Sequence, residues 1–131
     1  MKTTYSNRPR CCKGCSHAPN CLYFGGVAFK YQREVRDLEA ACRIAREHVD
    51  VVTTSGSGTG HVPPVEKISR MKRALGDWPL AIASGITPEN VKDYLPVADC
   101  FLVSTGIGKS FTELEPAKVL SLVREARSFA E

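Results

Sequence analysis

The sequence predicts an α/β protein in which four βα units surround a parallel sheet. Apolar runs that end in Gly, Ser or Thr alternate with amphipathic helical patterns from residue 22 onward, and this alternation is typical of parallel sheets with right-handed crossovers. The runs are apolar throughout, as expected for strands that are covered on both faces. Two architectures fit: an open doubly wound sheet, or half of a (β/α)8 barrel, since a whole barrel needs about 250 residues and this chain has 131.

The first two units are predicted between residue 22 and Gly76. The first has a strand at residues 22–29 and a helix at 34–47, whose apolar face consists of Val35, Leu38, Ala41, Cys42 and Ala45. The second has a strand at residues 50–54 and a helix that follows Pro63-Pro64 and ends at Gly76, with Val65, Ile68, Met71 and Leu75 buried. Proline is favoured at the start of a helix and glycine just beyond its end.

The last two units follow the same scheme. A strand is predicted at residues 79–83, and Thr87 is expected to cap a helix whose first residue is Pro88. That helix presents Val91, Tyr94 and Leu95 inward. The final strand is predicted at residues 99–103, and the final helix begins near Pro116 and packs Val119, Leu122, Val123, Ala126 and Phe129.

The first 21 residues differ in composition from the rest of the chain. The formal net charge of +4 comes from the first 20 residues, which contain Lys2, Arg8, Arg10 and Lys13 and no acidic residue. We therefore predict a basic, Cys-rich and poorly ordered leader at residues 1–21 and a half-barrel domain at residues 22–131. A basic segment can contact RNA, but we favour a solvated tail and do not expect a nucleic-acid partner.

Four of the six cysteines lie within or beside this leader. Cys12, Cys15 and Cys21, together with His17 or Cys11, are candidate zinc ligands because C-x-x-C turns place two thiolates for tetrahedral coordination. Zinc modules usually have two well-separated ligand pairs, so an oxidation-prone leader is the preferred interpretation and no other cofactor is expected. The isolated Cys42 and Cys100 are expected to be small buried hydrophobic residues.

Two patterns argue for a cytoplasmic location. No apolar run approaches the roughly 20 residues that span a bilayer, and the N-terminus lacks the apolar segment of a secretory signal. We therefore expect no membrane association.

Two glycine motifs have the wrong spacing for nucleotide binding. Ser55-Gly56-Ser57-Gly58-Thr59-Gly60 follows the second strand, but its spacing is G-x-G-x-G, and no acid follows at the end of the next strand. Gly108-Lys109-Ser110 resembles the end of a Walker loop, but the first glycine of that motif would fall at Val103. We therefore do not expect NAD or a Walker-type nucleotide.

The turns after the last two strands instead predict a phosphate site. Ser84-Gly85 and Thr105-Gly106 expose glycine amides and hydroxyls at the ends of consecutive strands. Free N–H groups at such turns suit phosphate oxygens, and barrels commonly bind phosphate between the loops of strands 7 and 8. Ser84, Gly85, Thr105 and Gly106 are therefore the predicted phosphate-binding residues.

Three segments carry a resemblance to a known family: Asp50-Val-Val-Thr-Thr-Ser-Gly-Ser-Gly-Thr-Gly60, Ala81-Ile-Ala-Ser-Gly-Ile-Thr-Pro-Glu-Asn-Val91 and Asp99-Cys-Phe-Leu-Val-Ser-Thr-Gly106. From residue 22 to 128 the chain resembles the C-terminal half of the BtpA family, which belongs to the ribulose-phosphate-binding barrels. Some members of this family are linked to photosystem I assembly, and some are described as nucleosidases. The resemblance implies that the four strands correspond to barrel strands 5 to 8.

The same resemblance implies roles for particular residues. Ser84 and Gly85 match the strand-7 phosphate turn, and Thr105 and Gly106 match the strand-8 turn. The strand-6 loop, which would close over the ligand, corresponds to Ser55, Gly56 and Thr59. The leader stands where strands 1 to 4 would be, so a homodimer or a complementary half-barrel is the expected partner.

Lys30 and His61 are further candidates at the ligand end of the sheet. Lys30 follows the first strand, where a lysine can serve as a base or an anion contact, and a solvated lysine is the alternative. His61 follows the glycine loop and either meets the ligand or turns toward solvent. Asp50 and Asp99 begin strands at the face that serves stability, so neither is proposed as catalytic.

Three functions follow from these residues. The first is binding of a phosphate-bearing small molecule, phosphoribosyl or nucleotide-like. The second is a nucleosidase or phosphoribosyl-transfer activity when a partner half completes the barrel. The third is an inactive truncated barrel or a zinc-dependent interaction module.

Overall fold

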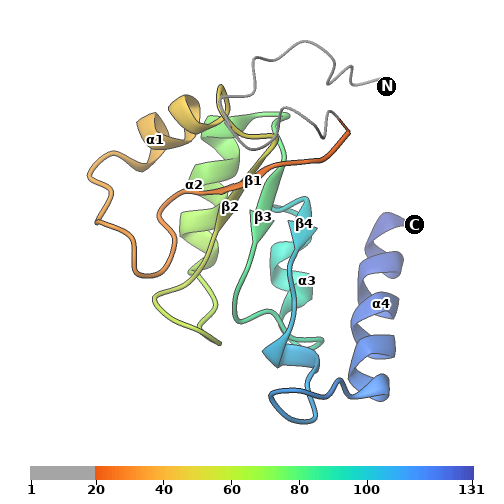
Figure 1. The fold of residues 1–131 in the computed structure, drawn as a ribbon. Helices are drawn as coiled ribbons and strands as arrows, with labels where there is room; N and C mark the ends of the chain where they lie inside the picture. The colour runs from red at the N-terminus through yellow and green to blue at the C-terminus, as the bar shows by residue number, and fades with distance from the viewer. Residues whose placement is uncertain (1–19) are drawn as a thin grey trace.

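The four predicted strands form one parallel sheet. In the computed structural model, residues 20–131 are described, and the strands are β1 (Phe24–Gly26), β2 (Val51–Thr54), β3 (Leu80–Ile82) and β4 (Cys100–Phe101). They pair in the order β1-β2-β3-β4 (Figure 1). A doubly wound sheet reverses its strand order at a switch point, whereas a barrel keeps chain order. The fold is therefore the half-barrel of the two predicted architectures.

The helices follow the same order as the strands. They are α1 (Leu38–Ala45), α2 (Val65–Leu75), α3 (Val91–Tyr94) and α4 (Pro116–Ala130), with a short 3-10 helix, η1 (Thr105–Ile107), after β4. Each α-helix contacts the next one along the chain. Right-handed crossovers between strands in chain order place successive helices on one face of a sheet, as in the outer layer of a barrel.

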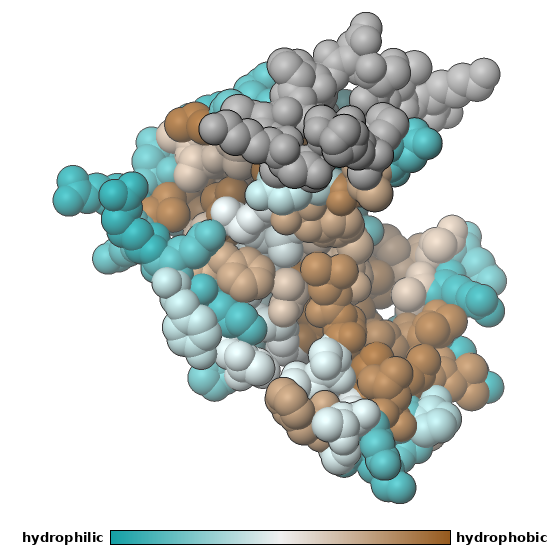
Figure 2. Space-filling view, viewed as in Figure 1, coloured by the Kyte–Doolittle hydropathy of each residue, from teal (hydrophilic) through white to brown (hydrophobic). Residues whose placement is uncertain are grey.

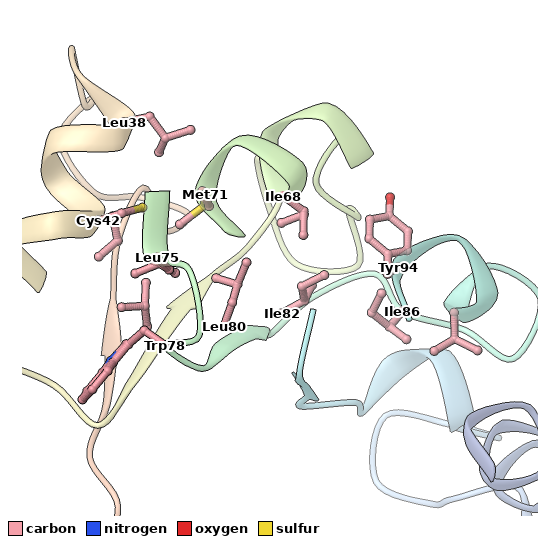
Figure 3. Close-up of a cluster of buried hydrophobic side chains, with 13 residues drawn as sticks. Leu38, Cys42, Ile68, Met71, Leu75, Trp78, Leu80, Ile82, Ile86 and Tyr94 are labelled. Carbon is pink, nitrogen blue, oxygen red and sulfur yellow. The ribbon is translucent and has the colours of Figure 1, made fainter. Parts of the chain in front are cut away.

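The core lies between this helix layer and the sheet (Figure 3). Val52, Leu80 and Ile82 pack from the strands against the helices. The helix side chains of the core are Leu38, Cys42, Ile68, Met71, Leu75, Val91 and Tyr94. The apolar faces predicted for the first three helices are therefore confirmed with two exceptions: Val35 precedes α1 and is not part of the core, and Val65 is exposed at the start of α2.

Cys42 confirms the expectation of a small buried residue, whereas Cys100 does so only in part. Cys42 is 0% exposed, and burial, with Glu39 nearby, raises the pKa of its thiol to about 11. Cys100 is half-buried, and burial raises the pKa of its thiol as well. Neither thiol is activated as a nucleophile, because thiolates form where the pKa is lowered.

Helix α1 starts later than the prediction of residue 34. Asp37 is its N-cap, and the Oδ1 atom of Asp37 accepts a hydrogen bond of 2.9 Å from the amide of Ala40. This contact satisfies a helix-end donor, so the chain becomes helical only at Leu38. Helix α2 ends at Gly76 as predicted, with a φ of 63°.

Thr87 makes the predicted capping contact, although α3 itself begins at Val91 rather than Pro88. Its Oγ1 atom accepts from the Asn90 amide at 3.3 Å, and the Asn90 Oδ1 atom accepts from the Thr87 amide at 2.8 Å. This reciprocal pair resembles a capping box and forms a turn that precedes the α-helix.

The outer strands are shorter than predicted. β1 covers residues 24–26 instead of 22–29, and β4 covers 100–101 instead of 99–103. Ala28 has a φ of 48°, a left-handed conformation that a strand does not allow. The apolar residues at the start of the predicted first strand are exposed because β1 is an edge strand.

The packing predicted for the last helix is wrong. Helix α4 has no buried residue, although Leu122 is partly buried against the core. It lies beside α3 and η1 (Figure 1), and Leu120 and Phe129 are 50% and 54% exposed. The apolar pattern at Val123 and Phe129 fits a helix with a second layer to cover it, and the described residues do not supply that layer.

Two aspartates stabilise the end of the sheet at which the strands begin, as the sequence predicts. The Oδ2 atom of Asp50 accepts from the Tyr23 amide at 2.7 Å. The Oδ2 atom of Asp99 accepts from the Leu80 amide at 2.9 Å and from Lys72 Nζ at 2.7 Å. Each carboxylate thus joins the beginning of its own strand to a neighbouring segment.

No helix within residues 20–131 is long and apolar enough to cross a membrane.

Replacing Asp50 by alanine is expected to lower the free energy of unfolding by about 1.5–3 kcal/mol, the typical contribution of a hydrogen bond to a charged group. Asp50 is buried, so its loss leaves the Tyr23 amide without its acceptor. Urea unfolding followed by circular dichroism measures the change. The control is Asp77→Ala at an exposed site after α2, and an equal loss in both variants would contradict the assigned role.

Candidate functional site

The loops that follow the four strands meet around one cavity. The loops after β2, β3 and β4 gather at the lower end of the molecule in Figure 1. A cavity of about 230 Å³ there is lined by residues from all four strand-end loops, including Lys30, Thr59, Gly85, Thr105 and Phe111. The carboxyl ends of parallel strands are where α/β folds bind ligands, so this cavity is the candidate site.

The turn after β3 is fixed by Ser84. Its Oγ atom accepts from the Gly56 amide at 2.9 Å and donates to the His61 carbonyl at 2.7 Å. The hydroxyl of Ser84 therefore joins the β2 and β3 loops. A ligand would receive from this turn chiefly the backbone amide of Gly85.

Gly85 occupies a position that only glycine tolerates. Its φ is 73°, and a Cβ atom would collide with the backbone of His61 and Val62. The Asn90 Nδ2 atom donates to the Gly85 carbonyl at 2.9 Å. The close approach of the β2 loop thus brings the turn after β3 to the edge of the cavity in a defined orientation.

The turn after β4 approaches the β3 loop equally closely. Gly106 lies against Ile86, whose carbonyl a Cβ atom at Gly106 would strike. Thr105 begins η1 and lines the cavity, whereas Gly106 lies just behind it. Within residues 20–131, the amides of Gly85, Thr105 and Gly106 donate no hydrogen bond, so they are available to an anion.

Lys30 brings a positive charge to the cavity. Its Nζ atom donates to Thr59 Oγ1 at 3.2 Å, and its amide donates to Ser55 Oγ at 2.7 Å. The ion pairs among residues 20–131 are Arg70–Glu39 and Lys72–Asp99, and neither involves Lys30. Its charge is therefore available to a ligand, as one interpretation of the sequence expects.

The glycine loop divides into lining and supporting residues. Thr59 lines the cavity. Ser55 and Gly56 are buried beneath the loop, where a Cβ atom at Gly56 would strike the His61 carbonyl. His61 is exposed and its Nδ1 atom lies 3.1 Å from Ser57 Oγ; its ring does not line the cavity within the described part of the chain.

Sequence reasoning missed Lys67 of α2, which supports the site from outside. Its Nζ atom donates to the carbonyls of Ala28 and Ser55, both at 2.8 Å. Burial lowers the pKa of Lys67. No local pattern indicates this role, because lysine on an amphipathic helix usually faces solvent. Phe111 was also missed: it lines the cavity, yet it is 93% exposed.

Most of the zinc candidates, namely Cys12, Cys15, His17 and Cys11, lie outside the described residues. Cys21 lies inside them and is exposed. Among residues 20–131, no group of three or more His, Cys, Asp or Glu side chains is placed to hold a metal.

The fold and the strand-end cavity define one half of a (β/α)8-barrel protein. The chain belongs to the BtpA family, which residues 24–128 match. This confirms the resemblance that the strand-end motifs suggested. An uncharacterised protein of Pyrococcus horikoshii is 28% identical over 91 residues, which cover 67% of this chain and 35% of the relative. The chain therefore spans about a third of the length of this relative.

Solved structures confirm the half-barrel. Phosphoribosyl anthranilate isomerase from Thermus thermophilus is similar with a TM-score of 0.63 and 18% identity, over 81% of this chain and 50% of that chain. The N-(5'-phosphoribosyl)anthranilate isomerase from Pyrococcus furiosus is similar with a TM-score of 0.55 and 20% identity, over 80% of this chain and 50% of that chain. At this identity the likeness concerns the fold alone, and it spans half of each solved chain.

Substituting alanine at Gly85 is expected to destabilise the protein more than the same change at Gly60. Both glycines have a positive φ, 73° and 78°, so both variants lose about 1–2 kcal/mol from the left-handed backbone. Only Gly85 has backbone in the way of a Cβ atom, since nothing lies within 4 Å at Gly60.

The collision is expected to cost G85A a further ~1–3 kcal/mol. Thermal and urea unfolding of both variants measures the difference. Equal losses would mean that the β2 and β3 loops do not meet as described.

Proposed function

We propose that the chain binds a phosphate-bearing small molecule of the phosphoribosyl class at the cavity on the strand ends. The observation that carries the proposal is the convergence of all four strand-end loops on one cavity. With a volume of about 230 Å³, this cavity is smaller than the roughly 300–1,000 Å³ of drug-sized ligand sites. It suits a phosphate group and its ester carbon, with the rest of the ligand outside.

The hydrogen-bonding groups of the cavity support an anion. Within residues 20–131 the amides of Gly85, Thr105 and Gly106 are unpaired, and consecutive amides at such turns form anion-binding concavities. Among the described residues, the side chain of Lys30 donates a hydrogen bond to the neutral Thr59 hydroxyl and forms no ion pair. No carboxylate lines the cavity within the described residues, so nothing there opposes a phosphate.

The comparisons support the phosphoribosyl part of the proposal. Both solved relatives are named for a substrate that carries a phosphoribosyl group, and they share the fold around the strand ends. The likeness does not extend to a reaction. The residues lining the cavity include no paired carboxylates, so we propose binding and assign no catalytic step.

Replacing Lys30 by alanine is expected to weaken binding of ribose 5-phosphate about tenfold or more, because a charged hydrogen bond to phosphate is lost. Isothermal titration calorimetry at fixed ionic strength measures both affinities. Lys92→Ala, which removes the same charge from the exposed face of α3, is the control and is expected to bind like the wild type. Absence of binding by the wild type at millimolar ligand would overturn the proposal.

We also propose that a second copy of this chain completes the barrel around the site. β1 and β4 are the edges of a four-stranded sheet, and parallel sheets are normally closed or covered. Hydrophobic side chains gather on the face seen in Figure 2, over the sheet and α4. In an eight-stranded closure, α4 of one copy meets α1 of the other, where Ile44 is 64% exposed.

A buried polar atom supports the same closure. Thr53 is 4% exposed, and its hydroxyl has no hydrogen-bond partner among the described residues. It pairs in register with Gly26 and Ala81, and its neighbours Val52 and Thr54 turn to the helix side. Alternation along a strand therefore directs Thr53 to the inner face, the face that a second half-barrel would cover.

The chain is expected to be a dimer by light scattering at micromolar concentration, and Val123→Lys is expected to make it monomeric by placing a charge in the apolar contact. Ser121→Lys adds the same charge at another exposed position of α4 and is expected to remain dimeric. A monomeric wild type would contradict the homodimer, and so would a dimer that V123K leaves intact.

A further inference from the structure

A second cavity lies away from the strand ends. It has a volume of about 390 Å³ and lies between the segment that leads into α1 and the first half of α2. Four cationic side chains line it, together with one carboxylate: Arg33, Arg36, Lys67, Arg70 and Glu34. This lining is more strongly charged than that of the cavity at the strand ends, where Lys30 is the one cationic residue among the described lining residues.

Three of these cations have no acidic partner among the described residues. Arg70 is neutralised by Glu39, with Nε to Oε1 at 2.8 Å and Nη2 to Oε2 at 3.0 Å. No ion pair within residues 20–131 involves Arg33, Arg36 or Lys67. One lining carboxylate therefore faces three uncompensated positive charges.

Lys67 is the least solvated of these cations. Its Nζ atom donates to two neutral carbonyls, those of Ala28 and Ser55, which leaves its third N–H and its whole charge unmatched. Burial lowers the pKa of Lys67, which means that the charged form is disfavoured where it lies. A nearby anion would stabilise the charged form of Lys67 and would accept a strong hydrogen bond from it.

The neighbouring acids offset these charges only in part. Asp37 is used as the N-cap of α1, and Glu39 is held by Arg70. Glu66 lies in the first turn of α2 and is exposed to solvent. Leu38 and Lys67 also place the N-terminal turns of α1 and α2 at the cavity, so the positive ends of two helix dipoles add to its field.

We propose that this cavity is a binding site for a small polyanion with at least two negative charges, such as a diphosphate group. Arginine side chains bind phosphate oxygens in pairs, and a lysine supplies a point charge. Arg33 and Arg36 contact the ligand from the segment before α1, and Lys67 contacts it from α2. The site is independent of the phosphate cavity proposed above.

The two cavities adjoin the same segment after β1, because Ala28 lines one of them and Lys30 lines the other. Lys67 of α2 donates hydrogen bonds to the carbonyls of Ala28 and Ser55. The Lys30 amide donates a hydrogen bond to the Ser55 hydroxyl, and Lys30 lines the strand-end cavity. A test must therefore tell the two anion sites apart.

The test is titration of the whole chain with inorganic pyrophosphate at fixed ionic strength, followed by calorimetry and by amide shifts in ¹⁵N-labelled protein. The double variant Arg33→Ala with Arg36→Ala is expected to bind at least about tenfold more weakly. Arg43→Ala with Arg73→Ala removes the same charge from exposed positions of α1 and α2 that do not line the cavity. This control is expected to keep the affinity of the wild type.

The amide shifts locate the anion. Shifts confined to residues 32–38 and 65–70, which persist in Lys30→Ala, support the proposal. Shifts confined to Gly85, Thr105 and Gly106 would overturn it, because pyrophosphate would then occupy the strand-end cavity. Equal weakening in both double variants, or no binding by the wild type at millimolar pyrophosphate, would overturn it as well. Failure of ribose 5-phosphate to bind would affect only the earlier proposal.

Discussion

Parallel pairing of the strands in chain order determines where the helices, the strand-end loops and the exposed edges of this protein lie. Because β1, β2, β3 and β4 lie side by side without a switch in order, each crossover carries its helix to the same face. The carboxyl ends of all four strands then meet at one edge, so four loops from distant parts of the sequence surround a single cavity. The same pairing leaves two edge strands and the outward side of α4 without a neighbour in the described chain. The site and the exposed apolar surface are therefore two consequences of one topology.

The loops around the site are held by a few polar contacts that cross between strands. Ser84 joins the β2 and β3 loops, and Ser55 joins the β1 and β2 loops. Lys67 reinforces the second junction from the helix layer. These residues use their polar atoms within the protein, whereas the backbone amides of Gly85 and Thr105 have no acceptor within residues 20–131. This arrangement suits an anion site in which backbone amides bind the ligand and side chains hold the loops in place. A site that is organised before the ligand arrives loses less conformational entropy on binding.

Local sequence patterns correctly predicted the features that depend on one helix or strand alone. Gly76 ends α2, Asp50 and Asp99 anchor strand beginnings, and the apolar positions of α1 and α2 form the core.

Local patterns failed to predict the features that depend on contacts between distant segments. β1 is short because Ala28 takes a left-handed conformation. Helix α4 stays exposed because an apolar pattern specifies a face to be covered but not the partner that covers it. Lys67 was missed because no pattern distinguishes a lysine that reaches buried carbonyls from one that faces solvent.

Local composition and spacing were enough to predict the alternation of strands and helices, the glycine turns at Ser84-Gly85 and Thr105-Gly106, and membership of the BtpA family. The choice between an open sheet and a half-barrel required the folded structure, since strand order depends on pairing between distant segments. The folded structure also showed that the Ser84 hydroxyl is engaged while Lys30 faces the cavity. The arginines near α1 and the lysine of α2 are separated by about thirty residues and share a cavity only after the helices pack. Long-range packing, which no local pattern encodes, therefore sets the charge around each cavity.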